Sequence, residues 1–341
     1  MNLQIALHNH QNDIIVNTRH SITIGVVDVW QRAVKPQEPD IIAGIVLTTV
    51  PYWAAYLNAL FSIYGISVSV LSVFCHQTPK VKYALNGNSS ICEVGDILFV
   101  HFHKEKSGFV YRNALLYQAK ISSSQPYQVP KSELHQLELY KQWPLFKYVQ
   151  SGTLNKQQRD VLPKSPHLGA QYLLIDDRGP IDPMSGVAGF LGTFPFGSCV
   201  ANDLLYIRNE LAVELFQFLQ LGSGKTFVDK NSSSVDGWSA LVWDLIQVGI
   251  QKAFNRKQSG HSNSPRISGW DLARFDGMSF ISTPALVSKS IAVQVLGAAN
   301  AATLFAFTDG GTNITSPDAI FTDDNAGTSL VIIETDETAE G

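Results

Sequence analysis

A long charge-free run is the clearest feature of the hydrophobic pattern. Residues 41–74 contain no charged side chain, and Asp40 precedes them as the N-cap of a helix does. Gly65 is typical of a helix end, and the β-rich segment 66–74 follows it. The pattern therefore predicts a buried helix over about 40–64 and then a buried strand.

A run of this length also fits a membrane-spanning helix. Pro51 interrupts the run. Polar side chains are also spread along it: Thr48, Thr49, Tyr52, Asn58 and Ser62. These residues favour a helix inside a soluble protein, and we expect no stable membrane insertion.

Two shorter apolar runs predict a β-hairpin. They span residues 95–102 and 113–120, and a polar connection separates them at residues 104–108. A helix is expected next, over about 132–142, because Pro144 cannot continue it.

The remaining segments complete an α/β pattern. Strands are expected at residues 22–27, 171–175, 291–296, 304–308 and 330–333, and helices at about 202–221 and 235–256. This mixture favours an α/β fold with a mixed central sheet flanked by helices.

A polar segment with two prolines, residues 151–168, is a candidate boundary between two parts of the chain. Residues 1–165 are expected to form the α/β core. Residues 166–341 are expected to form an α+β extension that is free to pack on the same core. Residues 334–341 are expected to be an acidic, disordered tail.

Composition indicates a globular protein in a reducing compartment. Hydrophobic residues make up 45% of the chain and charged residues 16%. The three cysteines are odd in number and widely spaced, so they indicate no disulfide framework. The N-terminal segment is polar and mixed, unlike a signal peptide, and a cytoplasmic location is expected.

Charge is unevenly distributed along the chain. The net charge is −4, but residues 101–165 contain ten Lys and Arg against four acids. Residues 308–341 contain eight acids and no base. The basic stretch is compatible with phosphate contact at one face, and equally with an ordinary solvated surface.

Chemistry-bearing side chains gather at one end of the predicted hairpin. Asp96 opens the first strand, where a buried carboxylate is costly unless it is solvated, paired or bound to a metal. Gln118 and Lys120 are two residues apart on the second strand, so they share one face. Antiparallel pairing brings all three to the same end of the sheet. A carboxylate and an amide oxygen suit Mg²⁺ or Mn²⁺, and a neighbouring lysine can stabilise charge at a phosphodiester.

This order of motifs resembles the PD-(D/E)XK nuclease superfamily, in its Gln-x-Lys variant. The next helix carries Gln136 and Tyr140 four residues apart, similar to the Gln-x-x-x-Tyr motif of RecB-like members. The matched stretch covers residues 93–140. The resemblance implies a restriction-endonuclease-like core and these roles: metal ligands Asp96 and Gln118, catalytic cation Lys120, and supporting residues Gln136 and Tyr140.

Two features depart from the family pattern. Gln118 stands where an acid is usual, which removes one negative charge from the metal site. The family often has an upstream acid or histidine on a helix, and the helix expected over about 40–64 contains neither. Glu93, just before the first strand, and His76, after the preceding one, are the candidates to replace it.

The resemblance implies a metal-dependent nuclease, with DNA as the expected substrate, acting in defence, restriction or repair. The competing interpretation is a nuclease-fold module with a weakened site that binds nucleic acid or a protein partner. A homo-oligomer is also left open. Each motif alone has a plain structural explanation, as a turn, a polar strand edge or a helix surface.

Three further motifs are interpreted as structural. The segment 222–226 lacks the first glycine of a phosphate-binding loop and follows a helix. Asp176 and Asp177 indicate a turn that ends a strand. His101 and His103 share a strand face without a Cys or His partner at metal spacing, so they are structural or adjacent to the site.

Overall fold

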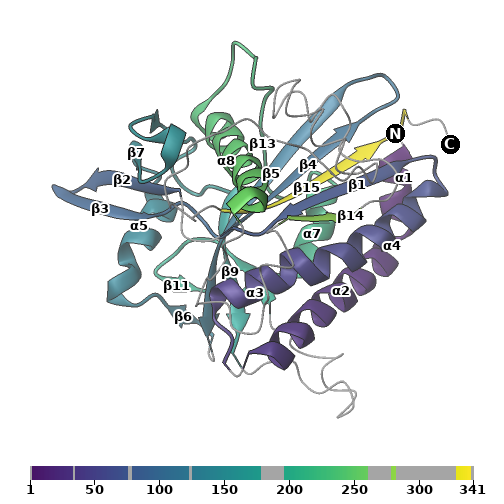
Figure 1. Cartoon of the computed structure of the whole chain (residues 1–341), viewed down its shortest axis with the longest axis horizontal. Coiled ribbons are helices and arrows are strands. Elements are labelled where there is room, and N and C mark those ends of the chain that lie inside the picture. The colour runs from purple at the N-terminus through teal and green to yellow at the C-terminus, as the bar shows by residue number, and fades with distance from the viewer. Residues whose placement is uncertain are drawn as a thin grey trace.

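Helices from the N-terminal part of the chain cover one face of a large mixed sheet (Figure 1). The computed structural model describes residues 2–33, 35–75, 79–122, 125–177, 196–259, 278–281 and 328–338, with the backbone alone for 32, 251–259 and 278–281. This arrangement confirms the predicted fold class, a mixed central sheet flanked by helices.

The helices on this face are α1 (Asn2–Asn9), α2 (Gln11–Arg32), α3 (Glu38–Gly44), a π-helical segment (Ile45–Thr49) and α4 (Val50–Ser62). The strand predicted at residues 22–27 is wrong, because these residues lie within α2. Ile22, Val26 and Val29 are buried at helical spacing, so packing of one helix face outweighs the β propensity of the branched side chains.

The helix predicted at residues 40–64 begins two residues earlier, at Glu38. Gln37 is the N-cap, and its backbone N–H donates to Asp40 Oδ2 at 2.9 Å. Pro39 occupies the first turn, where its missing N–H is tolerated. Asp40 is therefore the third helical residue and not the cap, and Glu38 becomes a helix residue.

The chain from Glu38 to Ser62 is one continuous helical run. Pro51 lies in the first turn of α4, directly after the π-helical segment. The backbone hydrogen-bond pattern therefore changes from π-helical to α-helical at this point, but the helix does not end. Among the described residues this run is long and apolar enough to cross a membrane, and 67% of its most apolar window is buried inside the protein. Core helices have the same properties.

The main sheet contains, within the described residues, nine strands in the order β12-β10-β9-β5-β4-β15-β1-β14, with β13 also on β5. Their bounds are β1 Ser67–Val73, β4 Ile97–Lys104, β5 Val110–Ser122, β9 Ala170–Asp176, β10 Phe196–Cys199, β12 Asn209–Glu210, β13 Lys225–Thr226, β14 Met278–Ile281 and β15 Ser329–Asp336. The predicted hairpin is confirmed, since β4 and β5 pair antiparallel with Ile97 opposite Tyr117. β9 runs parallel to β5.

The C-terminal strand β15 lies between β1 and β4, parallel to β4 and antiparallel to β1. The predicted strand at 330–333 is therefore confirmed. The predicted disordered tail is wrong for its first residues, because Glu334–Asp336 pair with both neighbours. The strands expected at 291–296 and 304–308 lie outside the described residues.

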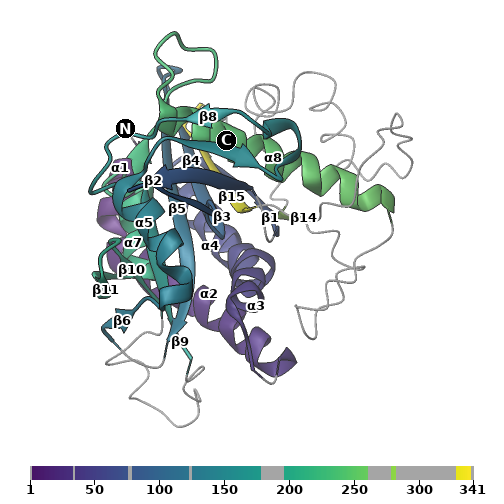
Figure 2. The ribbon, with the colours of Figure 1, turned by 90° about the vertical axis from the view of Figure 1, so that its left-hand side faces the viewer.

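A smaller sheet stands beside the main one, in the order β3-β2-β7-β8 (Figure 2). Its strands are β2 Lys80–Leu85, β3 Asn88–Glu93, β7 Phe146–Val149 and β8 Gln158–Arg159. Its inner face joins the core through Val81, Tyr83, Cys92, Phe146 and Tyr148. Helix α5 (Leu134–Gln142) contacts it, since Tyr83 donates its hydroxyl hydrogen bond to the His135 carbonyl.

The predicted helix over 132–142 is confirmed, with a 3₁₀ turn (Lys131–Glu133) as its first part. The two later helices are also confirmed, as α7 (Leu211–Leu219) and α8 (Gly237–Ser259). The first starts later than predicted because β11 (Leu204–Leu205) and β12 precede it. β11 pairs with β6 (Tyr127–Gln128).

Both faces of the main sheet are covered by apolar residues. One core lies towards α1–α4 and α7, and the other towards α5, α8 and the small sheet. Strands from residues 166–341, namely β9, β10 and β15, belong to the same sheet as β4 and β5. The C-terminal part therefore completes the central sheet.

Candidate active site

Asp96 and Gln118 meet at the end of the β4–β5 hairpin. The backbone N–H of Asp96 donates to the Tyr117 carbonyl at 2.8 Å, which places the carboxyl group opposite Gln118. Gln118 Nε2 donates to Asp96 Oδ2 at 2.5 Å, and the N–H of Ala119 donates to the same oxygen at 2.7 Å. The antiparallel register that the sequence predicts is what brings these residues together.

The surroundings of Asp96 favour its protonated form. Removal from water raises the pKa of its carboxyl to about 7; Lys120 opposes this rise, and Glu93 and Glu38 add to it. A carboxyl that titrates near neutral pH is stabilised as an anion by any additional cation that approaches it. Perturbed carboxyls of this kind are typical of functional sites.

Lys120 is buried beside this carboxyl, with 4% of its surface exposed. Its Nζ lies 2.9 Å from Glu133 Oε2 and 3.7 Å from Glu38 Oε1. Burial lowers the pKa of the ammonium, but Glu38, Asp96 and Glu133 more than offset this, so the pKa of Lys120 lies above its ordinary value. Lys120 is therefore a permanent cation at neutral pH and not a general base.

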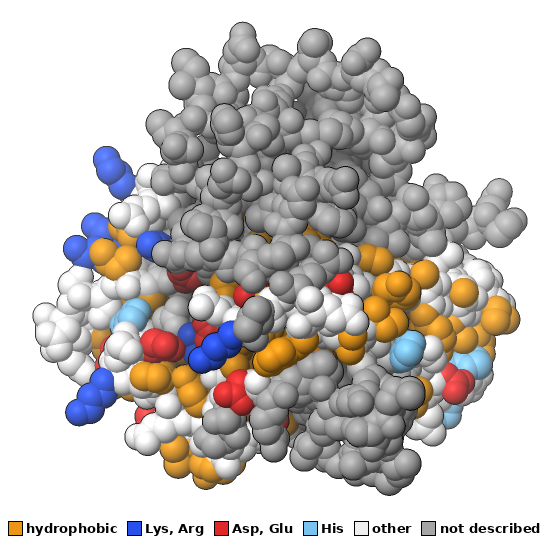
Figure 3. Space-filling model, turned by 60° about the horizontal axis from the view of Figure 1, so that its bottom comes forward, with side chains coloured by type: hydrophobic (Ala, Val, Ile, Leu, Met, Phe, Trp, Pro, Cys, Tyr) orange, Lys and Arg blue, Asp and Glu red, His pale blue; other side chains and the backbone are white. Residues whose placement is uncertain are grey.

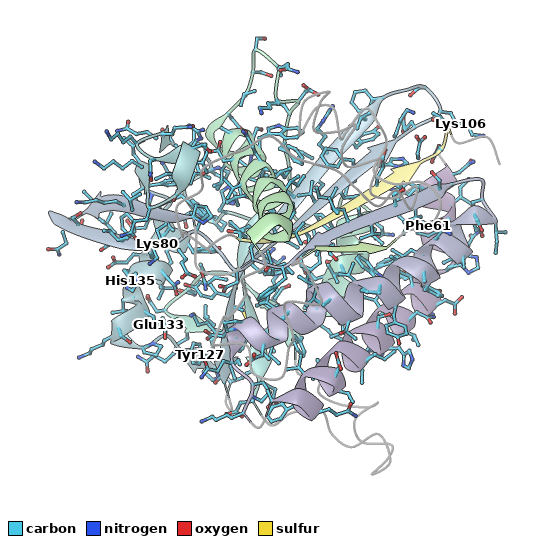
Figure 4. All side chains as sticks on the ribbon, in the orientation of Figure 1. Phe61, Lys80, Lys106, Tyr127, Glu133 and His135 are labelled. Atoms are coloured by element: carbon cyan, nitrogen blue, oxygen red, sulfur yellow. The ribbon has the colours of Figure 1, made fainter. Side chains whose placement is uncertain are left out.

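Two of these acids were missed by reasoning from the sequence. Glu38 is the first residue of α3, and Glu133 ends the 3₁₀ turn before α5 (Figure 4). Glu38 lies on a helix upstream of Asp96, where the resembled family often has an acid, and it falls outside the expected helix because that helix is predicted to begin at Asp40. The signal for it was Pro39, which is common in the first turn of a helix.

Tyr140 holds the segment before Asp96 in place. Its side chain is buried, and its hydroxyl donates to the Val94 carbonyl at 2.7 Å. A Cβ added to Gly95 would lie 2.7 Å from this hydroxyl, so the close approach requires glycine. Gln136 is on the same helix and half-buried. Tyr140 thus contacts the backbone beside the acid, and its role in orienting the substrate or Lys120 stays a prediction.

Of Glu93 and His76, the two candidates to replace the upstream acid, only Glu93 lies within the described residues. Glu93 ends β3, three residues before Asp96, and its charge contributes to the raised pKa of the Asp96 carboxyl. His76 lies outside the described residues.

The donor set is compatible with a magnesium ion. Gln118 Oε1 is buried and accepts no hydrogen bond among the described residues. Within those residues no three His, Cys, Asp or Glu side chains are grouped to hold a metal. Mg²⁺ keeps several waters and is commonly held by one or two carboxylates, so Asp96 and Gln118 fit it with water as the remaining ligands.

The three motifs interpreted as structural lie at the ends of elements or make contacts within the fold. The segment 222–226 follows α7 and ends in β13, and Lys225 contacts Asp236 at 3.5 Å. His101 and His103 are fully buried, and both bond the Thr335 hydroxyl, at 3.0 and 2.9 Å. β9 ends at Asp176.

Comparisons with protein-family models, with curated proteins and with solved structures found no match to this chain. The resemblance to the nuclease superfamily therefore stays a prediction from the motifs.

Proposed function

We propose that this protein is a metal-dependent nuclease that hydrolyses phosphodiester bonds at the Asp96–Lys120 site. One observation carries the proposal: acidic side chains from three separate parts of the chain converge on a single buried lysine at the end of the central sheet. Asp96, Glu38 and Glu133 surround Lys120, and Gln118 bonds Asp96. The carboxylates outnumber the one ammonium, which suits binding of a divalent metal. The metal and Lys120 together would then offer positive charge to an anionic substrate.

Each side chain has a role that follows from its contacts. Asp96 and Gln118 would hold Mg²⁺ or Mn²⁺, which supplies Lewis-acid charge at the phosphodiester when bound. An ammonium has three donors, so Lys120 keeps one for a phosphate oxygen beyond its contacts with Glu133 and Glu38. A fixed cation there stabilises the charge that develops in the transition state.

The test is a cleavage assay on single-stranded and duplex DNA and RNA with Mg²⁺, Mn²⁺ or EDTA. Wild type is expected to cleave DNA only with metal. Asp96→Ala and Lys120→Ala are expected to lose at least about a hundredfold in rate, as removal of a transition-state group does. Metal-dependent cleavage that survives both substitutions would disprove the site assignment.

A binding module with a weakened site is the second candidate. The neutral amide of Gln118 and the two carboxylates held by Lys120 favour it, because the site is partly satisfied by its own residues. Nucleic-acid binding without cleavage by any form of the protein, with any metal, is the result that would select it. DNA as the substrate, a cytoplasmic location and a protein partner or homo-oligomer stay predictions.

A further inference from the structure

The outer face of the small sheet carries a row of side chains with an unusual charge arrangement. Lys82 on β2 lies directly opposite Lys147 on β7. Ile91 on β3 and Gln158 on β8 continue the row on either side. Cross-strand partners share one face of a sheet, and all four residues are exposed.

Two lysines placed directly opposite each other repel, which destabilises the strand pair. Within the described part of the chain, neither Lys82 nor Lys147 takes part in an ion pair. Lys80 adds a third ammonium two residues along β2, where Glu93 on β3 lies directly opposite it. A face that concentrates positive charge in this way is stabilised by an anion that lies across it.

The face leads to the candidate active site. Glu93 lies opposite Lys80 in the next row of the sheet, and its charge acts on Asp96. The side of the molecule that carries β2, β3 and α5 is also where Lys and Arg side chains gather in Figure 3, whereas the opposite side of that view shows hydrophobic, His and acidic side chains. Lys80 marks the inner end of the face in Figure 4.

We propose that this basic face, Lys80, Lys82 and Lys147, binds the sugar–phosphate backbone of a nucleic acid and leads it to Asp96 and Lys120. Residues two apart on a strand are about 6.8 Å apart. Successive phosphates of one DNA strand are separated by a rise of about 3.4 Å along the helix axis and also by their turn around it, so neighbouring phosphates lie at a similar spacing. Lys80 and Lys82 therefore match neighbouring phosphates. Ile91 and Leu145, 51% and 56% exposed, offer apolar surface to bases or sugars. The inference rests on the proposed nuclease function, but binding can be measured apart from cleavage.

The test measures binding of fluorescent DNA oligonucleotides by anisotropy in EDTA, so that no cleavage occurs, between about 50 and 200 mM salt. The variant is Lys82→Gln with Lys147→Gln. Its matched control is Lys106→Gln with Lys230→Gln, two exposed lysines elsewhere, of which Lys106 lies on the far side of the molecule in Figure 4.

We expect the first pair to weaken binding at least about tenfold and to reduce the salt slope by about 1.4 to 1.8, the loss of two phosphate contacts. The control pair should change affinity less than about twofold. Equal effects of both pairs, or no DNA binding by wild type, would overturn the proposal. Equal competition by polyglutamate would also overturn it, because the face would then bind any polyanion.

The two proposals fail separately. Binding that depends on Lys82 and Lys147, without cleavage under any metal condition, supports the basic face and removes the nuclease function. Metal-dependent cleavage with unchanged binding by the Lys82 and Lys147 variant supports the nuclease and removes the basic face.

Discussion

Glu38 Oε1 lies 3.7 Å from the Nζ of Lys120, although 81 residues separate the two in the chain. Helix α3 starts at Glu38, so this contact connects the first turn of a helix on one face of the sheet with a side chain that projects from the other. A carboxylate so placed raises the pKa of Lys120 and of Asp96 together.

Glu38→Gln should weaken metal binding without removing the site. The neutral amide takes away one negative charge near Asp96, while Glu133 still holds Lys120 at 2.9 Å. We expect the Mg²⁺ concentration for half-maximal cleavage to rise about tenfold, equivalent to about 1.4 kcal/mol. Magnesium titrations of the cleavage rate measure this. Glu210→Gln, which loses an ion pair with Arg19, is the matched control and should leave the titration unchanged.

Asp96 should make the stability of the protein depend on pH. Its pKa is about 7 in the folded protein and 3.8 ordinarily, so the folded state holds a proton that the unfolded chain releases between about pH 4 and 7. The free energy of unfolding should therefore fall as pH rises through this window, by up to about 1.4 kcal/mol per pH unit. Asp96→Asn should remove that slope.

Urea unfolding at several pH values from 4 to about 8 measures the slope. Above pH 7 a bound cation stabilises the ionised carboxyl, so Mg²⁺ should raise the free energy of unfolding of wild type and not of Asp96→Asn. Identical pH profiles for the two proteins would show that Asp96 is not the group responsible.

Tyr140→Phe should affect both stability and cleavage. It leaves the buried Val94 carbonyl without its donor, at a cost of about 1 to 3 kcal/mol, and frees the segment that carries Asp96. Tyr148→Phe is the comparison, because that hydroxyl bonds Asp244, far along the chain from the site residues. Similar stability losses with slower cleavage only for Tyr140→Phe are expected. A cleavage rate equal in both variants would contradict a positioning role.

Gly95→Ala should distort the site by steric clash. The added Cβ would lie 2.7 Å from both Leu116 Cδ1 and the Tyr140 hydroxyl. Overpacking of this kind costs about 1 to 3 kcal/mol. Gly222→Ala meets its nearest neighbour at 3.5 Å and should be tolerated. Thermal unfolding of the two variants separates them, and equal melting temperatures would argue against close packing at Gly95.

Local patterns were enough to predict the hairpin and the pair it brings together. Asp96 begins one strand and Gln118 lies near the end of the next, so a short polar connection between them fixes their proximity. The same holds for α5, which is the next α-helix along the chain and ends just before Pro144. Contacts between elements that are adjacent in the sequence can therefore be predicted from local sequence patterns.

Contacts between segments far apart in the sequence cannot be predicted from local patterns. Glu38 reaches Lys120 only because α3 packs over the end of β5, and no local motif marks that approach. The β-branched residues of 22–27 favour a strand in isolation, and only packing against the other helices makes them helical. The place of β15 between β1 and β4 likewise depends on the whole sheet.

The position of β15 has a consequence for how the protein is made. β4 directly follows Asp96, yet its neighbour on one side is synthesised more than two hundred residues later. Until the ribosome has released residues 329–336, β1 and β4 have unpaired edges at the centre of the future sheet, which invite wrong pairing or chaperone binding. A chain that stops before residue 329 would lack the strand that joins β1 to β4, so we expect the sheet beside Asp96 to form only after this segment has been synthesised.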